Sequence, residues 1–315
     1  MTTPPDISAV NARASSENFP VAGWFMAARH RPLVRAYYAF ARTADDIADA
    51  PDLTILQKLA ALDELELALQ KGTGSAENPG HHAARLLGAM LRDKNLPLEL
   101  ATDLLIAFRA DARNTIVRTF ADVLAYCANS AAPVGRFLLA IHDESKGHDA
   151  SNALCAVLQI LNHVQDARKD ALELRRCYIP MAWLNAQNID LVDLHSFMGH
   201  TVYRPGFIPL RDDYRIEGEE DVVDLKPNPL DNAKMRVCLN MMLDECEKLL
   251  AAAAPLPTAL HDRGLAAQSA AIITLARCLL KRLRSDNPWT HNIRLRALDW
   301  LAALLSGAKT WLTKA

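Results

Sequence analysis

The 315-residue sequence predicts an all-α fold. Half of its residues are hydrophobic, whereas aromatic residues make up only 6%, a composition that supplies a large core and favours closely packed helices. Apolar residues recur at helical spacing in most segments, while alternating strand patterns are few and no Asn-Gly hairpin signal occurs. Length alone is compatible with about two domains, but an all-helical single domain of this size is common enough, and we expect one.

Proline, glycine and capping residues divide the chain into helices and connections. Residues 1–15 are expected to form an N-terminal arm and 16–315 the helical domain. Pro133 is expected to kink its helix. Prolines and glycines make 198–230 an irregular insertion or lid, with an exposed variable loop as the favoured interpretation. The expected helices are 33–49, 54–70, 81–95, 97–113, 119–142, 151–174, 231–251, 258–284 and 291–313, with a short one beginning near 190.

Charge and composition exclude several classes of function. The net charge is −2 and the pI about 6.6, so nothing indicates nucleic-acid binding. The six cysteines show no zinc-site spacing and are expected to be reduced thiols. The N-terminus lacks the apolar core of a signal peptide, and no uninterrupted apolar run reaches the length of about 18 residues that predicts a transmembrane helix. We therefore expect a cytoplasmic protein.

The most informative segment is an acidic turn at the end of the helix expected at 33–49. Arg42, Asp45 and Asp49 are spaced i, i+3 and i+7 and therefore share one helix face, with Asp46 at its flank. Residues 45 and 49 lie about 6 Å apart along the helix axis. Two carboxylates this close repel each other unless they face water or bind a cation such as Mg²⁺, which prefers oxygen ligands. For this stripe alone, a solvated acidic turn is an equally good interpretation.

A second polar stripe lies on the otherwise apolar helix expected at 151–174. Its members recur at intervals that keep them on one face, and they are Gln159, Asn162, His163, Asp166 and Asp170. Burying such a stripe is costly unless it faces a wet or metal-filled cavity. The two acidic helices could therefore face each other across one cavity and bind Mg²⁺ together with the phosphates that Mg²⁺ carries.

Together the two stripes resemble the two aspartate-rich motifs of the squalene/phytoene synthase family, here Asp45-Asp46-Ile47-Ala48-Asp49 and Asp166-Ala167-Arg168-Lys169-Asp170. Supporting segments that also match are Ser16-Glu17-Asn18-Phe19, Tyr38-Ala39-Phe40-Ala41-Arg42, Tyr126-Cys127, Pro133-Val134-Gly135 and Arg176-Cys177-Tyr178-Ile179-Pro180. The run from Glu17 to Ala22 resembles the hopanoid-pathway branch of the family, the hydroxysqualene synthases (HpnC). The resemblance covers roughly 15–195 strongly and the C-terminal third weakly.

This resemblance implies an isoprenoid-synthase-like helical bundle around a central cavity, in which we expect 33–49 and 153–172 to be antiparallel. It also implies Mg²⁺-dependent ionisation of a prenyl diphosphate, with a dry apolar pocket for the carbocation. The implied metal ligands are Asp45, Asp46, Asp49, Asn162, Asp166 and Asp170, of which Asp45, Asp49, Asp166 and Asp170 are expected to be catalytic. The implied substrate-binding residues are Ser16, Tyr38, Arg42, Tyr126, Gln159, His163, Gln165, Arg176 and Tyr178. For His163, orienting a water and being a satisfied core residue are equally good interpretations.

One position departs from the family pattern. Main-branch synthases usually carry an Arg immediately before the first aspartate of the second motif, where this chain has Gln165. The missing charge should weaken binding of a second diphosphate, which suits conversion of presqualene diphosphate and water to hydroxysqualene and diphosphate. The alternatives are a head-to-head prenyl transferase that makes presqualene diphosphate, squalene or phytoene, and a non-catalytic assembly protein on the same fold. No Gly-rich dinucleotide loop supports an NADPH-dependent step.

Two further expectations concern the surface. Trp289, Trp300 and Trp311 lie among basic residues near the C-terminus, which indicates either a membrane-interface face or ordinary core packing. We expect peripheral contact with the inner face of the plasma membrane and functional coupling to other hopanoid-pathway enzymes. Asp111 is expected at the surface rather than as a residue that supports the site.

Overall fold

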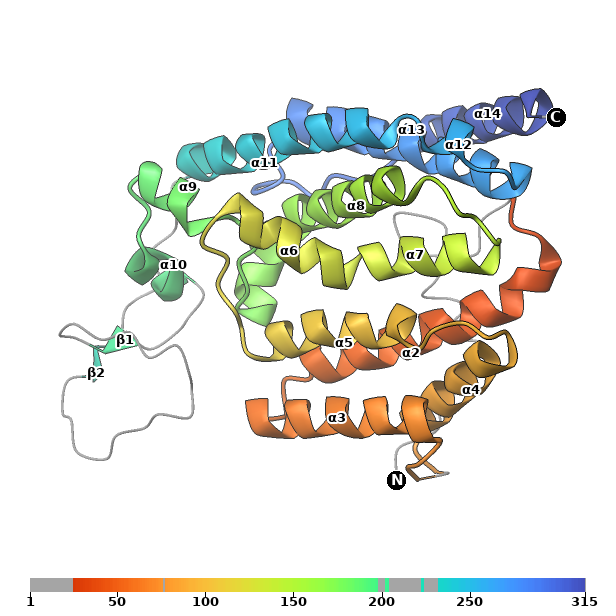
Figure 1. Cartoon of the computed structure of the whole chain (residues 1–315). Coiled ribbons are helices and arrows are strands. Elements are labelled where there is room, and N and C mark those ends of the chain that lie inside the picture. The colour runs from red at the N-terminus through yellow and green to blue at the C-terminus, as the bar shows by residue number, and fades with distance from the viewer. Residues whose placement is uncertain (1–24, 76, 198–201, 204–221, 224–231, 315) are drawn as a thin grey trace.

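The computed structural model describes residues 25–75, 77–197, 202–203, 222–223 and 232–314 (Figure 1). The predicted all-α class is confirmed: apart from a two-residue antiparallel pair, β1 (Val202–Tyr203) and β2 (Val222–Val223), the regular elements of this part of the chain are helices. The expected arm at 1–15, the Ser16 segment and most of the insertion expected at 198–230 lie outside the described residues.

The helices follow the predicted order closely. In chain order they are η1 (Ala28–His30), α2 (Arg31–Asp49), α3 (Ile55–Lys71), α4 (Pro79–Asp93), α5 (Glu99–Ala112), α6 (Phe120–Ser130), α7 (Ala132–Ile141), α8 (His148–Lys169), the π-helical turn η2 (Asp170–Leu174), α9 (Met181–Ala186), α10 (Leu191–Phe197), α11 (Asn232–Ala253), α12 (Leu256–Ala259), α13 (Arg263–Ser285) and α14 (Ala297–Thr313).

Local signals explain where these helices begin and end. Helix α2 stops at Asp49, before Ala50-Pro51. A capping box between Thr54 and Gln57 starts α3, and Gly72 ends it in the left-handed region at φ +69°. The helix expected at 119–142 is broken rather than bent: α6 ends at Ser130, and Pro133 lies in the first turn of α7, where its missing N–H costs nothing.

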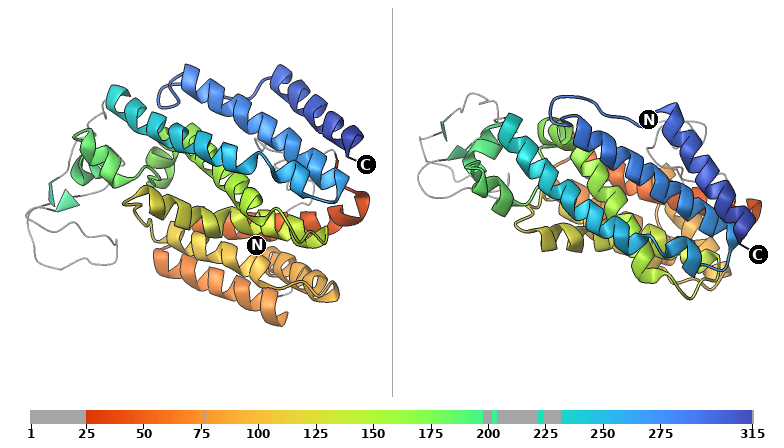
Figure 2. Two further views of the ribbon diagram at one scale, coloured as in Figure 1. Left: turned by 45° about the horizontal axis from the view of Figure 1, so that its top comes forward. Right: turned by 90° about the horizontal axis from the view of Figure 1, so that it is seen from above.

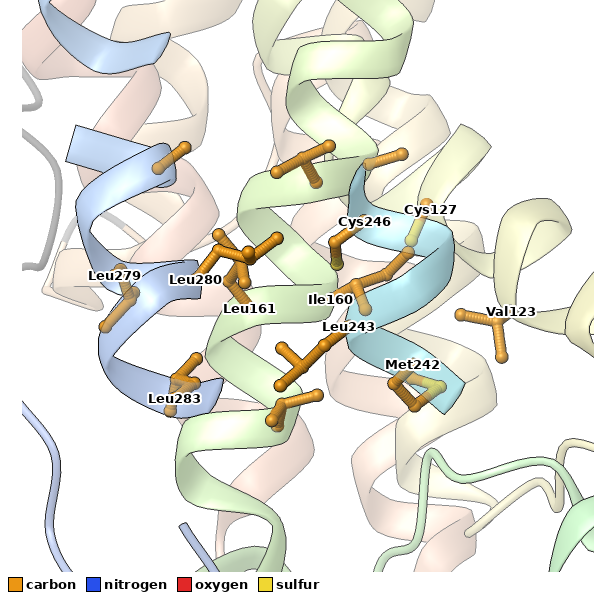
Figure 3. Packing of buried hydrophobic residues seen from close by; sticks show 14 of the residues in the cluster. Val123, Cys127, Ile160, Leu161, Met242, Leu243, Cys246, Leu279, Leu280 and Leu283 are labelled. Carbon is orange, nitrogen blue, oxygen red and sulfur yellow. The ribbon is translucent and has the colours of Figure 1, made fainter. Parts of the chain in front are cut away.

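The core has two large parts, which meet around a central cavity, and a small third part. One large part joins α2, α3, α4, α5 and α7, and the other includes α6, α8, α9, α11 and α13. The small part joins α13 and α14. In Figure 3, Ile160 and Leu161 of α8 lie between the side chains of α6 and α11 on one side and those of α13 on the other. In Figure 2, α11, α13 and α14 lie side by side as an outer layer.

Helices α2 and α8 run in the same direction, which corrects the antiparallel arrangement expected from the sequence (Figure 1). Val34 and Ser151, near their N-terminal ends, line one cavity, and Asp49 at the end of α2 pairs with Arg176 just beyond α8. The expectation was wrong because sequence separation does not fix the number of chain reversals. Along the chain, α3, α5 and the α6–α7 pair come between α2 and α8, and they alternate in direction.

Two described helical stretches are long and apolar enough to cross a membrane by length and composition alone. These are Phe120–Ile141, which the break at Ala131 divides, and α13. About half of the first window (44%) and most of the second (72%) are buried inside the bundle. Both stretches therefore fit core helices.

Candidate active site

The acidic turn of α2 is held by an arginine one turn earlier on the same helix. The Arg42 guanidinium contacts Asp45 and Asp46, at 2.8 Å to each carboxylate. Burial, followed by the charge of Asp49, raises the pKa of Asp45 to about 7, although Arg42 acts in the opposite direction. The charged form of Asp45 is therefore disfavoured even beside Arg42.

The second acidic cluster lies where α8 passes into the π-helical turn η2. Burial and the neighbouring Asp166 raise the pKa of Asp170 to about 7, and burial also raises the pKa of Asp166. Arg175 closes the turn in the left-handed region at φ 55°, and the N–H of Arg176 donates to the carbonyl of Asp170 (3.1 Å). π-Turns of this kind occur frequently at functional sites.

Arg176 joins the two acidic clusters. Its guanidinium donates to Asp49 (2.5 Å) and to the carbonyl of Ala48 (2.9 Å) while remaining only 8% exposed. Asp49 and Arg176 both act on the pKa of Asp170, which shows that the ends of α2 and α8 lie near each other. Lys58 of α3 is a second cation beside them: burial and the charge of Arg176 lower its pKa, whereas Asp49 raises it. Sequence analysis missed Lys58 because it belongs to neither motif.

Asp111 is buried, which corrects its expected surface position. It is 7% exposed and accepts hydrogen bonds from the hydroxyls of Tyr126 and Tyr178, each at 2.8 Å. Burial raises the pKa of Asp111, while Arg176 and the two tyrosine hydroxyls lower it. Asp111 thus fixes two of the predicted substrate-binding residues next to Arg176, and the only sequence signal was its polarity at the end of an apolar helix.

His163 is a neutral imidazole inside this network. Its ring stacks on that of Tyr178, with centroids 3.7 Å apart, and burial followed by the charge of Arg176 lowers its pKa to about 3. The Gln159 side-chain amide lies 3.0 Å from Nε2. If that amide donates, Nδ1 carries the proton, and Nδ1 is buried with no hydrogen-bond partner among the described residues.

Next to these polar groups lies an apolar cavity of about 240 Å³. Helices α2, α7, α8, α12 and α13 form its walls. Tyr38, predicted to bind substrate, lines it, and so does Gly135, where an added Cβ would lie 2.5 Å from Ser151 Oγ and 2.7 Å from Cys155 Sγ. Phe40 does not line this cavity and is fully buried in the core.

The other predicted residues are distributed as follows. Asn162 lies on α8, one turn before Asp166, and is partly buried. The Gln165 side-chain amide donates to the carbonyl of Ile293 (2.7 Å), so it contacts the segment that precedes α14. Ser16 is outside the described residues.

The carboxylates of the two acidic clusters are the type of oxygen ligand that a hard divalent cation binds. Among the side chains that the structure describes, no three of the Asp, Glu, His or Cys type are already gathered into a metal site. The two acidic clusters nevertheless offer oxygen ligands from neighbouring helix ends, as Mg²⁺ prefers. Burial, followed by neighbouring carboxylates, raises the pKa values of Asp45 and Asp170 to about 7, which disfavours their charged forms, and a bound cation would favour those forms.

Comparison with known proteins agrees with this arrangement. Residues 12–205 match the family model described as squalene/phytoene synthase. The chain belongs to the squalene/phytoene synthase family. A hydroxysqualene synthase of Rhodopseudomonas palustris is 34% identical over 91% of this chain and 86% of its own length. A hydroxysqualene synthase of Sinorhizobium fredii is 33% identical over 92% of this chain and 87% of its own length. The solved structure of the squalene synthase HpnC of Alicyclobacillus acidocaldarius superimposes with a TM-score of 0.63, at 26% identity, over 89% of this chain and 93% of that one.

Membership of the squalene/phytoene synthase family confirms the resemblance inferred from the two aspartate-rich motifs. It also places the C-terminal third within the family, since the similarity to the hydroxysqualene synthases covers about nine-tenths of the chain. Helices α12 and α13, which carry no recognised motif, form one wall of the cavity.

Proposed function

We propose that this chain is a hydroxysqualene synthase, which converts presqualene diphosphate and water to hydroxysqualene and diphosphate in squalene and hopanoid biosynthesis. The observation that carries the proposal is the juxtaposition of two acidic helix ends, two cations and an apolar cavity. The relatives named hydroxysqualene synthase, similar over nearly the whole chain, support this choice within the family.

The polar groups divide into metal ligands and diphosphate donors. We propose that Asp45, Asp49, Asn162, Asp166 and Asp170, with Asp46 at the flank, hold Mg²⁺. When bound, Mg²⁺ would neutralise the leaving diphosphate and lower the barrier to C–O cleavage. Arg42, Arg176 and Lys58 would donate charge-assisted hydrogen bonds to the same diphosphate. Arg176 is already fixed by Asp49, so little side-chain entropy is lost when the diphosphate binds.

The remaining residues control the carbocation. The apolar cavity excludes bulk water and holds the prenyl arms, so that rearrangement precedes capture. His163 is neutral at physiological pH and does not repel a cation, and we assign it the role of orienting the capturing water. Tyr126 and Tyr178, fixed by Asp111, would present their ring faces to the carbocation.

Head-to-head prenyl transfer is the second candidate, because phytoene synthases share the family. It requires two diphosphates in one cavity, whose mutual repulsion at a separation of a few Å costs several kcal/mol unless cations offset it. Gln165 adds no positive charge. Both acidic motifs keep their aspartates, and nothing favours a non-catalytic role.

Product analysis tests the proposal directly. Purified protein with Mg²⁺ and without NADPH is incubated separately with presqualene diphosphate and with farnesyl diphosphate, and the lipids are identified by mass spectrometry. We expect hydroxysqualene from the first substrate and little condensation of the second. Efficient formation of presqualene diphosphate from farnesyl diphosphate would favour the prenyl transferase.

Gln165→Arg tests the charge argument within the same assay. The variant should bind farnesyl diphosphate more tightly without a higher yield of hydroxysqualene. Gln165→Met is the matched control, because it removes the hydrogen bond to Ile293 without adding charge. Equal effects of both variants would assign the change to the lost contact and not to charge.

We further propose that the protein is cytoplasmic and contacts the inner face of the plasma membrane through α14. Several leucines of α14 are exposed, among them Leu298 at 76% and Leu312 at 83%. Such a surface would pass an insoluble product directly to other hopanoid-pathway enzymes at the membrane. The tryptophans do not form it: Trp289 is buried, and Trp311 lies under Arg263 and beside Phe25.

A further inference from the structure

One polar side chain in the apolar cavity has no partner. Gln268 of α13 is 4% exposed, lines the cavity, and has no hydrogen-bond partner for either amide atom among the described residues. Both atoms of a buried amide normally form hydrogen bonds, because leaving them unpaired is costly. The proposed site contains no role for this residue.

Gln268 lies at the end of the cavity remote from the aspartates. Ala41 and Leu158 line the near end, one and two turns before Asp45 and Asp166 on their helices. Helix α13 starts at the far end, where Glu144, just before α8, accepts hydrogen bonds from the backbone N–H groups of residues 261 and 262. It then advances with α8, so that Leu280 comes beside Leu161 (Figure 3). Gln268, five residues into α13, is therefore level with the first turns of α8.

The length of the cavity matches one farnesyl arm. From Asp45 to Val34 the distance along α2 is about 16 Å, and from Asp166 to Ser151 along α8 it is about 22 Å, at about 1.5 Å per residue. A farnesyl chain, with about twelve main-chain carbons, extends about 15 Å at ordinary single-bond geometry. The diphosphate and a cation would lie between the first carbon of the farnesyl chain and the carboxylates, which adds a few Å to this length. The tip of the arm then ends close to Gln268, and one more isoprene unit, about 5 Å, would pass it.

We propose that Gln268 sets the length limit of the prenyl arm, so that the cavity accepts farnesyl-derived chains and rejects chains one isoprene unit longer; this rests on the proposed function. Water entering the cavity can hydrate the amide while the arm stops short of it. A longer arm displaces that water and offers no hydrogen-bonding group in return. Such an unpaired amide weakens binding about ten- to a hundred-fold.

Binding of unreactive substrate analogues tests the proposal. Farnesyl and geranylgeranyl S-thiolodiphosphate are titrated calorimetrically into the full chain with Mg²⁺, and the ratio of their dissociation constants is compared between variants. Gln268→Met keeps the length and shape of the side chain and removes its polarity, with Gln268→Leu as a second apolar variant. Gln268→Glu is the polar control. Circular dichroism checks that each variant is folded.

The wild-type protein should bind the geranylgeranyl analogue at least about ten-fold more weakly than the farnesyl analogue. Gln268→Met should narrow this ratio to about three-fold or less, whereas Gln268→Glu should not narrow it. A wild-type ratio near one, or an unchanged ratio in both apolar variants, would overturn the proposal. Because the analogues do not react, the ratio remains decisive even if presqualene diphosphate is not turned over, an outcome that would refute only the proposed function.

Discussion

Arg176 is the residue on which the polar half of the site depends. It is one of the few charged side chains in the described part of the protein that are almost fully buried, and it contacts both the carboxylate and the backbone at the end of α2. Removing one member of such a buried pair leaves the other charge unpaired, which is more costly than the loss of the pair itself. Arg176 thus has a structural role before any substrate binds.

The aspartates should behave differently from Arg176, because their charges repel one another. Asp45→Asn and Asp166→Asn each remove one ligand charge from the proposed Mg²⁺ site, and we expect turnover to be abolished in both. The folded state should survive, since each substitution also relieves repulsion from Asp49 or Asp170. Diphosphate release and circular dichroism measure the two effects. Wild-type turnover in both variants at saturating Mg²⁺ would refute the ligand assignment.

At the scale of the elements, α3 and α4 pack closely against each other at Gly88. A Cβ added at Gly88 would lie 2.1 Å from the carbonyl oxygen of Leu69. Gly88→Ala therefore forces the two helices apart, and we expect it to lower the free energy of unfolding by about 1–3 kcal/mol or more. Urea denaturation measures this. Leu86→Ala is the control, at an exposed position of the same helix, and should change the free energy of unfolding by no more than about 0.5 kcal/mol. A similar loss of stability in both variants would contradict the steric explanation.

We expect the packing of α14 against α13 to depend on pH through Asp299. Arg282 donates to both of its carboxylate oxygens (2.7 and 3.1 Å), and the N–H of Arg296 donates as well (2.7 Å). The hydrogen bond from Arg282 lowers the pKa of Asp299, despite burial. A carboxylate whose pKa is lower in the folded state stabilises the fold fully at pH values above its unfolded-state pKa of about 3.9. This stabilisation disappears as the pH falls through the folded-state pKa.

Asp299→Asn should accordingly destabilise the protein at pH 7, and the difference from wild type should shrink towards pH 3. Thermal unfolding followed at several pH values between these limits measures this. A difference that is independent of pH would show that the carboxylate charge does not contribute.

Sequence patterns predicted the helices well but not their relations in space. Periodicity and caps located α2, α3 and α8 to within a few residues, because these signals are local. The direction of α8 relative to α2 and the burial of Asp111 depend on how five intervening helices pack, which no local signal encodes. Gln268 escaped notice for the same reason: a single glutamine in an apolar helix becomes informative only when its cavity is known.

At the scale of the whole molecule, α14 forms the outermost helix of the layer that also contains α11 and α13 (Figure 2). Its exposed Leu298, Leu301, Leu305 and Leu312 are spaced i, i+3, i+7 and i+14 and therefore share one face. Its only acidic residue, Asp299, is buried against Arg282, while Lys309 is exposed. An apolar face without exposed acidic residues suits the surface of an anionic bilayer.

We therefore expect the protein to co-sediment with vesicles containing anionic lipid and less with zwitterionic vesicles. Replacing Leu298, Leu305 and Leu312 together with Ser should reduce sedimentation at least about five-fold, because each lost leucine removes apolar area from the membrane contact. These side chains are exposed, so the fold should tolerate their replacement. Leu56→Ser is the matched control: Leu56 is 69% exposed and lies on α3, on the opposite side of the bundle (Figure 1). Equal sedimentation of the triple variant and the wild type, with the fold intact by circular dichroism, would exclude α14 as the membrane contact.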